Sequence, residues 1–100
     1  MAKKILVYWR DIPAQVIIQR GRKREKVQLS HRFQEAIDRA AMRAGKGGSE
    51  AYIEEWRRET TAIEDPADGA QLAREEAEAI EQSYSDDQLL QMIRNHGVAE

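Results

Sequence analysis

Four side chains near the start of the chain have the chemistry of a binding site and lie in or beside one predicted bend. An apolar run ends at Arg10 and Asp11, and a second apolar run follows Pro13. Because proline fixes its own φ and keeps the preceding residue out of the helical region, this segment predicts the turn of a β-hairpin. Tryptophan and arginine are enriched at the centres of protein interfaces. The candidate partner-binding residues are therefore Trp9, Arg10, Asp11 and Gln15.

The alternative for the same bend is a purely structural role. Trp9 would then belong to the core, and Arg10 would pair with its neighbour Asp11. Each of these side chains can lock a turn as readily as it can contact a ligand, so both interpretations remain open on the residues alone.

A second group of residues is strongly cationic. Residues 20–26 contain five Lys or Arg and one Glu. The helix predicted after Ser30 would add backbone N–H groups, which suit an anion such as phosphate. The candidate anion-binding residues are Arg20, Arg22, Lys23, Arg24, Lys26, Ser30 and Arg32. The competing interpretation is a solvated loop whose charges keep a sheet edge from pairing with other chains.

Patterns typical of catalysis or metal binding are weak. The chain has no cysteine, which removes thiolate chemistry. His31 and His96 have no metal-ligand spacing, and the Gly-Lys-Gly-Gly-Ser segment at 45–49 matches neither phosphate-binding glycine motif. We therefore expect no catalytic residues, no metal and no cofactor, and we favour a binding protein over an enzyme.

Charge is divided unevenly along a chain of one expected domain, residues 1–100. The net charge is −2, yet residues 1–48 hold 12 Lys or Arg and 4 Asp or Glu, whereas residues 49–100 hold 4 and 14. The two halves either attract one another across the fold, or the basic half binds an anionic ligand. A pI of about 5.7 argues against a nucleic-acid-binding domain.

Apolar runs are too short for a membrane protein. No run approaches the roughly 18 residues that span a bilayer, and residues 5–9 are too few for the apolar region of a signal peptide. We expect a cytoplasmic protein with no membrane partner.

Two strands and two further candidate strands would position the bend and the basic run. Residues 4–9 are apolar on both faces, which predicts a strand covered on both sides. Residues 14–20 alternate between apolar and polar, which predicts a half-exposed strand near an edge. The candidate further strands are residues 26–29 and 60–63.

Helical patterns dominate the rest of the chain. An N-cap at Ser30 precedes a helix whose apolar face is Phe33, Ala36, Ile37, Ala40, Ala41 and Ala44. A glycine-rich joint at 45–48 leads to a second helix over 49–58, with an apolar stripe of Tyr52, Ile53 and Trp56. Asp65 and Pro66 predict the start of a third helix that runs to residue 82.

A fourth helix completes the predicted fold. A capping box at 85–88 opens the fourth helix, with Leu89, Leu90 and Ile93 facing inward. The predicted class is α+β, with a small antiparallel sheet made of a β-hairpin and a candidate third strand, packed by about four helices. Residues 1–29 form the basic, strand-rich part, and residues 30–97 form the helical part, which is acidic from residue 49.

Several segments together resemble a known family. They are Val-Tyr-Trp-Arg-Asp-Ile-Pro-Ala-Gln-Val at 7–16, together with 26–30, Phe33, 36–38 and 52–57. These segments resemble the small alphaproteobacterial proteins called virulence factor, which are related to a domain of conserved virulence factor C. The family name implies no toxin, and the resemblance implies no catalytic residues.

The same resemblance implies an accessory role. Genes of that family often lie beside folate-linked and corrinoid-linked one-carbon enzymes. The implied partner is another protein, such as a methylenetetrahydrofolate reductase or a corrinoid-linked methyltransferase, and the implied function is that of an accessory subunit. The alternative function is anion or nucleic-acid binding through residues 20–26.

Overall fold

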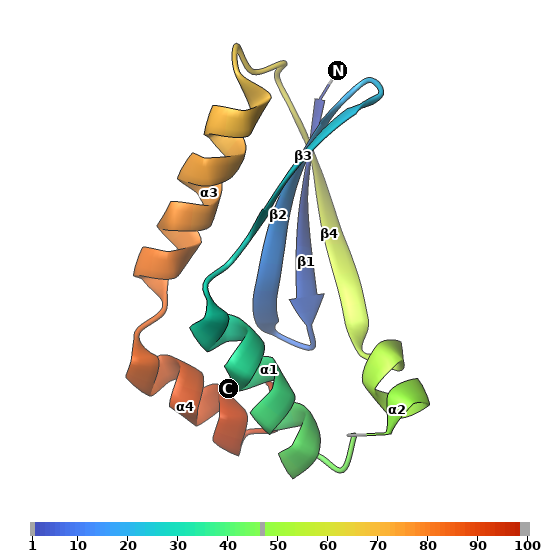
Figure 1. Ribbon diagram of the computed structural model, residues 1–100, viewed down its shortest axis with the longest axis vertical. Helices are drawn as coiled ribbons and strands as arrows, with labels where there is room; N and C mark the ends of the chain where they lie inside the picture. Colours follow the sequence, from blue (N-terminus) through green and yellow to red (C-terminus); the bar gives the residue numbers. More distant parts are fainter. Residues whose placement is uncertain (1, 47, 99–100) are drawn as a thin grey trace.

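The computed structural model describes residues 2–46 and 48–98, except for the side chain of Ser49. Gly47, in the predicted glycine-rich joint, lies outside the described residues. The strands are β1 (Ala2–Trp9), β2 (Ile12–Arg20), β3 (Lys23–Gln28) and β4 (Trp56–Ile63). The helices are α1 (His31–Arg43), α2 (Ser49–Glu54), α3 (Gly69–Ser83) and α4 (Asp86–Arg94). Figure 1 shows their arrangement.

The four strands form one antiparallel sheet in the order β3-β2-β1-β4. β1 and β2 pair as the predicted hairpin, from Ala2 opposite Arg20 to Trp9 opposite Ile12, with a register shift between Val7 and Tyr8. The predicted fold class, α+β with a small antiparallel sheet packed by helices, is confirmed.

The position of β2 differs from the prediction. β2 is an inner strand rather than a strand near an edge, because β3 pairs along its outer side from Gln15 opposite Gln28 to Arg20 opposite Lys23. The candidate strand at 26–29 exists but begins at Lys23, so most of the basic run is strand and only Gly21 and Arg22 form the turn. Gly21 takes a φ of +60°, which glycine adopts without strain.

The second helix is shorter than predicted, and β4 is longer. α2 ends at Glu54, and β4 pairs with β1 from Trp9 opposite Trp56 to Ala2 opposite Ile63. Pairing along the whole of β1 outweighs the helical spacing of the apolar residues, which local propensity alone favoured. Ile53, placed by the prediction in a buried stripe, is 64% exposed.

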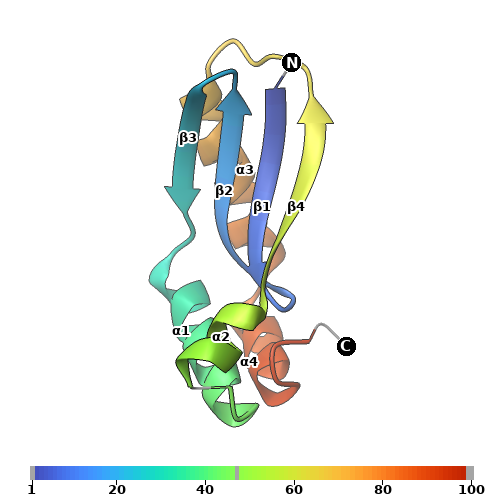
Figure 2. The same ribbon diagram turned by 90° about the vertical axis from the view of Figure 1, so that its right-hand side faces the viewer.

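The helices occupy one face and one end of the sheet. α3 packs against β2 and β3, and α1 packs against α4 and the end of β2. Figure 1 shows α1 and α4 below the sheet, beyond the turn between β1 and β2. Figure 2 shows the sheet in front of α3, and no helix in the described part of the chain crosses the face turned to the viewer. One face of the sheet is therefore covered and the other is open.

The predicted capping residues mark the observed helix starts only in part. α3 begins at Gly69 rather than at Pro66, because the carboxylate of Asp68 caps it by accepting the N–H of Gln71 at 3.2 Å. The predicted capping box of α4 is present between Ser85 and Gln88. Ser30 precedes α1 as predicted, but its side chain makes no capping hydrogen bond.

The main core lies between the covered face of the sheet and the helices. The predicted face of α1 is buried at Phe33, Ala36, Ile37, Ala40 and Ala41, whereas Ala44 is half-buried. On α4, Leu89 and Ile93 are buried as predicted, Leu90 is half-buried, and Met92 is also buried. A second, smaller cluster of Ile5, Val7 and Ile17 lies on the open side of the sheet.

Candidate binding surface on the open face of the sheet

The predicted bend is held by contacts within the fold. Trp9 is fully buried, its indole N–H donates to the carbonyl of Tyr52 at 2.9 Å, and the two rings stack with centroids 5.9 Å apart. Gly97 lies against the same indole, and a Cβ atom there would be 2.9 Å from its Cζ3 atom. Trp9 is thus a core residue, with no exposed area for direct contact with a partner.

The charged residues of the bend pair with residues of other elements. Arg10 donates from Nη1 to the carbonyl of His96 at 2.9 Å, and its Nε lies 3.3 Å from a carboxylate oxygen of Glu55. Asp11 accepts from Nη2 of Arg57 at 3.1 Å, and its backbone N–H donates to the carbonyl of Gly97. These contacts tie the bend to α2, β4 and the segment after α4.

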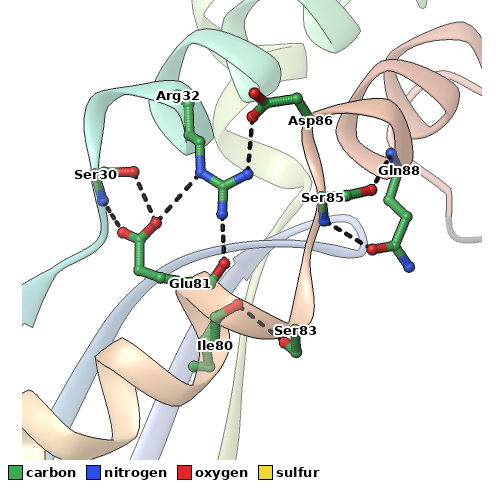
Figure 3. A network of polar contacts seen from close by, with 8 residues as sticks. All are labelled: Ser30, Arg32, Ile80, Glu81, Ser83, Ser85, Asp86 and Gln88. Atoms are coloured by element: carbon green, nitrogen blue, oxygen red, sulfur yellow. Dashed lines mark hydrogen bonds and ion pairs between the residues drawn. The ribbon is translucent and has the colours of Figure 1, made fainter.

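The start of α1 already holds an anion from within the chain. The carboxylate of Glu81 accepts the backbone N–H of Ser30 at 2.5 Å and the Ser30 hydroxyl at 2.8 Å. Arg32 donates to the same carboxylate at 3.3 Å and to Asp86 at 3.0 Å (Figure 3). Glu81 therefore takes the position in which an external anion was expected.

The basic run is divided between the two faces of the sheet. Arg20 donates to the carbonyl of Pro66 at 2.7 Å. With Lys23 and Glu25, Arg20 lines a hollow of about 190 Å³ next to the start of α3. Arg22 lies in the turn. Because side chains alternate along a strand, Arg24 and Lys26 point to the opposite, open side, so the run does not form one cluster.

Cross-strand register defines the residues of the open side, because residues directly opposite one another in a sheet share a face. Ile17 of the small apolar cluster is opposite Ile5 and Lys26, and Ile5 is opposite Thr60. We call this surface the open face. Its residues are Lys3, Ile5, Val7, Gln15, Ile17, Gln19, Arg24, Lys26, Gln28, Trp56, Arg58, Thr60 and Ala62. Of the four candidate residues at the bend, only Gln15 lies on it.

An apolar centre surrounded by polar side chains makes up the open face. Ile5, Val7 and Ile17 are only 6%, 8% and 1% exposed, although no helix in the described part of the chain crosses them. The long side chains around them must therefore lie over them, as lysine and arginine stems do on apolar surface.

All formal charges on the open face are positive. Its charged residues are Lys3, Arg24, Lys26 and Arg58, and the strand positions of this face hold no carboxylate. Within the described residues, none of the four forms an ion pair or a side-chain hydrogen bond. The open face thus presents four cations that the described fold leaves without a carboxylate.

At the end of the open face next to α1, residues of the sheet and of α1 line an open hollow of about 490 Å³. Its lining combines apolar side chains with three carboxamides, an imidazole and an indole. The lining residues are Val7, Ala14, Gln15, Gln28, Leu29, His31, Gln34 and Trp56. Carboxamides both donate and accept hydrogen bonds without carrying charge, so this hollow suits neutral polar groups next to apolar ones.

A contrasting cluster lies on the covered side, around Arg57. Its guanidinium stacks 4.5 Å from the ring centre of Tyr8 and donates to Glu59, Asp11 and the carbonyl of Arg10. The hydrogen bond to Glu59, assisted by Asp11, raises the pKa of Arg57. Burial, with the nearby charge of Glu59, raises the pKa of Tyr8. Here the cation is neutralised by the chain itself.

Tyr84 behaves like Tyr8. Burial is the main cause that raises its pKa, and the charge of Asp11 adds to the effect. Both phenols therefore stay neutral at physiological pH and can act as hydrogen-bond donors. In the described part of the chain, no three His, Asp or Glu side chains gather as metal ligands. Within the same residues, no helix has the length and apolar character needed to cross a membrane.

Reasoning from the sequence missed Lys3 and Arg58 because each lies far along the chain from the basic run. The alternation of Lys23, Glu25 and Val27 with Arg24, Lys26 and Gln28 was a usable signal. It separates the run into two faces as soon as residues 23–28 are recognised as a strand.

The fold and this surface define a class: a small α+β protein that leaves one cationic face of its sheet uncovered. The family model described as Virulence factor matches residues 7–93, so the chain belongs to this family. The resemblance to a virulence factor family is confirmed, and the match extends through α3 and most of α4. No curated protein and no solved structure matches the chain significantly.

Proposed function

We propose that the protein is a binding subunit that docks an acidic surface of a partner protein on its open face. The observation that carries this proposal is the unpaired state of Lys3, Arg24, Lys26 and Arg58 among the described residues. Four like charges on one face repel one another. A partner surface of opposite charge offsets this repulsion, and the complementary charges speed association and fix the orientation of the two proteins.

Carboxylates are abundant in this chain, so their absence from the open face is selective. The sequence has 18 Asp or Glu. On the other side of the sheet, Lys4 pairs with Glu76 at 3.0 Å, and elsewhere Arg10 pairs with Glu55 and Arg32 with Glu81. Cations that help to hold the fold have intramolecular partners, which supports a different role for those of the open face.

A protein fits this surface better than a nucleic acid does. Proteins that bind single strands stack successive bases on aromatic side chains, whereas Trp56 is the one aromatic residue among the described residues of the open face. Cations without a carboxylate of their own suit an acidic protein surface, because charge complementarity fixes the orientation of the two partners. Nucleic acid is the second candidate, favoured by the unpaired Arg24 and Lys26.

The resemblance to the virulence factor family suggests which partner to test. Its gene neighbourhoods support an accessory subunit of a folate-linked or corrinoid-linked one-carbon enzyme, and a methylenetetrahydrofolate reductase is the first partner on this view. A cytoplasmic location belongs to the same proposal.

The test compares two variants that lose the same charge. One carries Arg24→Gln, Lys26→Gln and Arg58→Gln on the open face. The control carries Arg43→Gln, Arg74→Gln and Arg94→Gln, which are exposed helix residues. Wild-type protein and both variants are titrated by calorimetry against purified methylenetetrahydrofolate reductase and against a corrinoid-linked methyltransferase. We expect the open-face variant to bind about tenfold or more weakly than wild type, and the control to bind within about twofold.

Three results would count against the proposal. One is equal binding of a partner by the open-face variant and wild type. Another is an equal loss in both variants, because bulk charge rather than this face would then drive association. The third is that wild type binds a single-stranded oligonucleotide but neither of the two enzymes. Nucleic-acid binding, the second candidate, would then replace the proposal.

A further inference from the structure

We propose that the hollow at the end of the open face next to α1 is a specificity pocket for one aromatic side chain, carried by an extended acidic segment of the partner. This inference rests on the proposed function and adds to it the chemistry of the segment that is recognised. It commits to a peptide-like occupant, in which carboxylates flank an aromatic anchor.

The size of the hollow fits such an occupant. At about 490 Å³, it lies within the range of roughly 300 to 1,000 Å³ found for ligand sites in proteins. The hollow can therefore hold an aromatic ring together with the peptide groups on either side of it. Val7, Ala14 and Leu29 supply apolar contacts for the ring.

Contact with Tyr52 holds the Trp56 side chain in one orientation. Its ring meets that of Tyr52 edge-to-face, with centroids 5.8 Å apart and an interplanar angle of 84°. Tyr52 in turn stacks on Trp9, which is fully buried and hydrogen-bonded to the Tyr52 carbonyl. Aromatic pairs in such offset or perpendicular arrangements add to the energy of burial. Because the Trp56 indole is already ordered, less conformational entropy is lost when a second ring binds against it.

The three carboxamides match the backbone of an extended segment. Gln15 and Gln28 are directly opposite one another on β2 and β3, and Gln34 reaches the hollow from α1. Gln34 donates from Nε2 to Asp38 at 3.0 Å, which orients its amide. Because each amide can donate and accept, these side chains can bind both the N–H and the C=O of peptide groups.

Cations of the open face lie beside the hollow. Arg58 is opposite Val7, a residue of its lining, and Lys26 lies two residues before Gln28 on the same strand. A segment that places its ring in the hollow and continues over the sheet brings its neighbouring carboxylates to Lys26 and Arg58. Charge complementarity thus selects an acidic segment, and the hollow selects the aromatic residue within it.

The test uses two fluorescein-labelled peptides that differ at one position, Glu-Glu-Glu-Phe-Glu-Glu-Glu and Glu-Glu-Glu-Ala-Glu-Glu-Glu. Binding to wild-type protein is measured by fluorescence anisotropy at low and high salt. We expect the phenylalanine peptide to bind about tenfold tighter than the alanine peptide. Both affinities should fall with salt, because the shared carboxylates are screened.

Variants that fill the hollow distinguish the contribution of the pocket to binding from the contribution of the charges on the open face. Gln34→Trp adds a large side chain at an exposed position of α1, and Gln28→Trp does the same from β3, so the second variant serves if the first fails to fold. In either variant, the phenylalanine peptide should lose its advantage while the alanine peptide binds as before.

The possible failures are distinct. If both peptides bind wild type equally and in a salt-dependent way, the pocket is overturned and the proposed function stands. If the phenylalanine peptide keeps its advantage in the filled variants, the ring binds elsewhere and the pocket is again overturned. If neither peptide binds at low salt, acidic segments do not dock on this face, and the proposed function falls together with the pocket.

Discussion

Cations on the covered side of this protein and cations on its open face have different neighbours. On the covered side, Lys4 contacts Glu76, and Arg57 contacts Asp11 and Glu59. On the open face, Arg24 and Lys26 form no ion pair with a carboxylate of the described residues. The acidic helix α3 pairs with Lys4 and Arg32, so it neutralises only part of the basic half. Attraction between the two halves therefore accounts for the charges of the covered side, and an acidic partner is what we propose for those of the open face.

The largest effect is expected in the core beneath the covered side. Phe33 is buried and packs edge-to-face on Tyr84, with ring centroids 5.7 Å apart. Phe33→Ala should lower the free energy of unfolding by about 3 to 5 kcal/mol, because a large cavity is left. Urea denaturation measures this loss, with Gln19→Ala on the open face as the control. A loss below about 1 kcal/mol would mean that α1 packs through another face.

A smaller loss is expected where a carboxylate holds two elements together. Glu81→Gln removes the charge that accepts from Ser30 and Arg32, so unfolding should become easier by about 1 to 2 kcal/mol. Glu78→Gln, an exposed change on the same helix, should have almost no effect. Equal stability of the two variants in thermal melts would show that the contacts of Glu81 contribute nothing.

Alkaline pH should weaken the covered side. Burial raises the pKa of both Tyr8 and Tyr84. Above the ordinary tyrosine pKa of about 10, the unfolded chain releases protons that the folded chain keeps, so stability is lost as pH rises through the folded pKa values. Below that ordinary pKa this contribution is fully present. The double variant Tyr8→Phe, Tyr84→Phe should show a shallower fall in Tm above about pH 10. A fall as steep as in wild type would assign the alkaline loss to other groups.

The smallest effect on stability is expected on the open face. Replacing Arg24, Lys26 and Arg58 with Gln should change the free energy of unfolding by less than about 0.5 kcal/mol for each residue, since no intramolecular partner among the described residues is lost. The same change at Arg32 and Arg57, which are paired, should cost more. If the open-face variant melts well below the variant of the paired residues, the comparison between the two faces fails.

Local signals in the sequence were enough to predict part of this structure. Pro13 marked the hairpin, and the 85–88 capping box marked α4, because each depends on residues close in sequence. Ser30 marked the start of α1 by its position, although its hydroxyl donates to Glu81 and makes no capping hydrogen bond. Trp9 shows the limit of such reasoning. Its type suits a core and an interface equally, and only its contacts with Tyr52 and Gly97 decide between them.

Features that depend on distant pairing could not be predicted. The length of β4 follows from its pairing with all of β1. The open face unites residues from four strands, so no local segment carries its pattern. Ser30 and Arg32 did indicate anion-binding chemistry, but the sequence could not show that Glu81, about fifty residues later, would supply the anion.

Binding at the open face can be observed directly by titrating ¹⁵N-arginine-labelled protein with the acidic phenylalanine peptide and following the arginine Nε–Hε signals by NMR. We expect the signals of Arg24 and Arg58 on the open face to shift with added peptide. Those of Arg10, Arg32 and Arg57, which already contact carboxylates of the chain, should stay in place. Shifts confined to the paired arginines, or spread equally over all five, would contradict the claim that the open face is the binding surface.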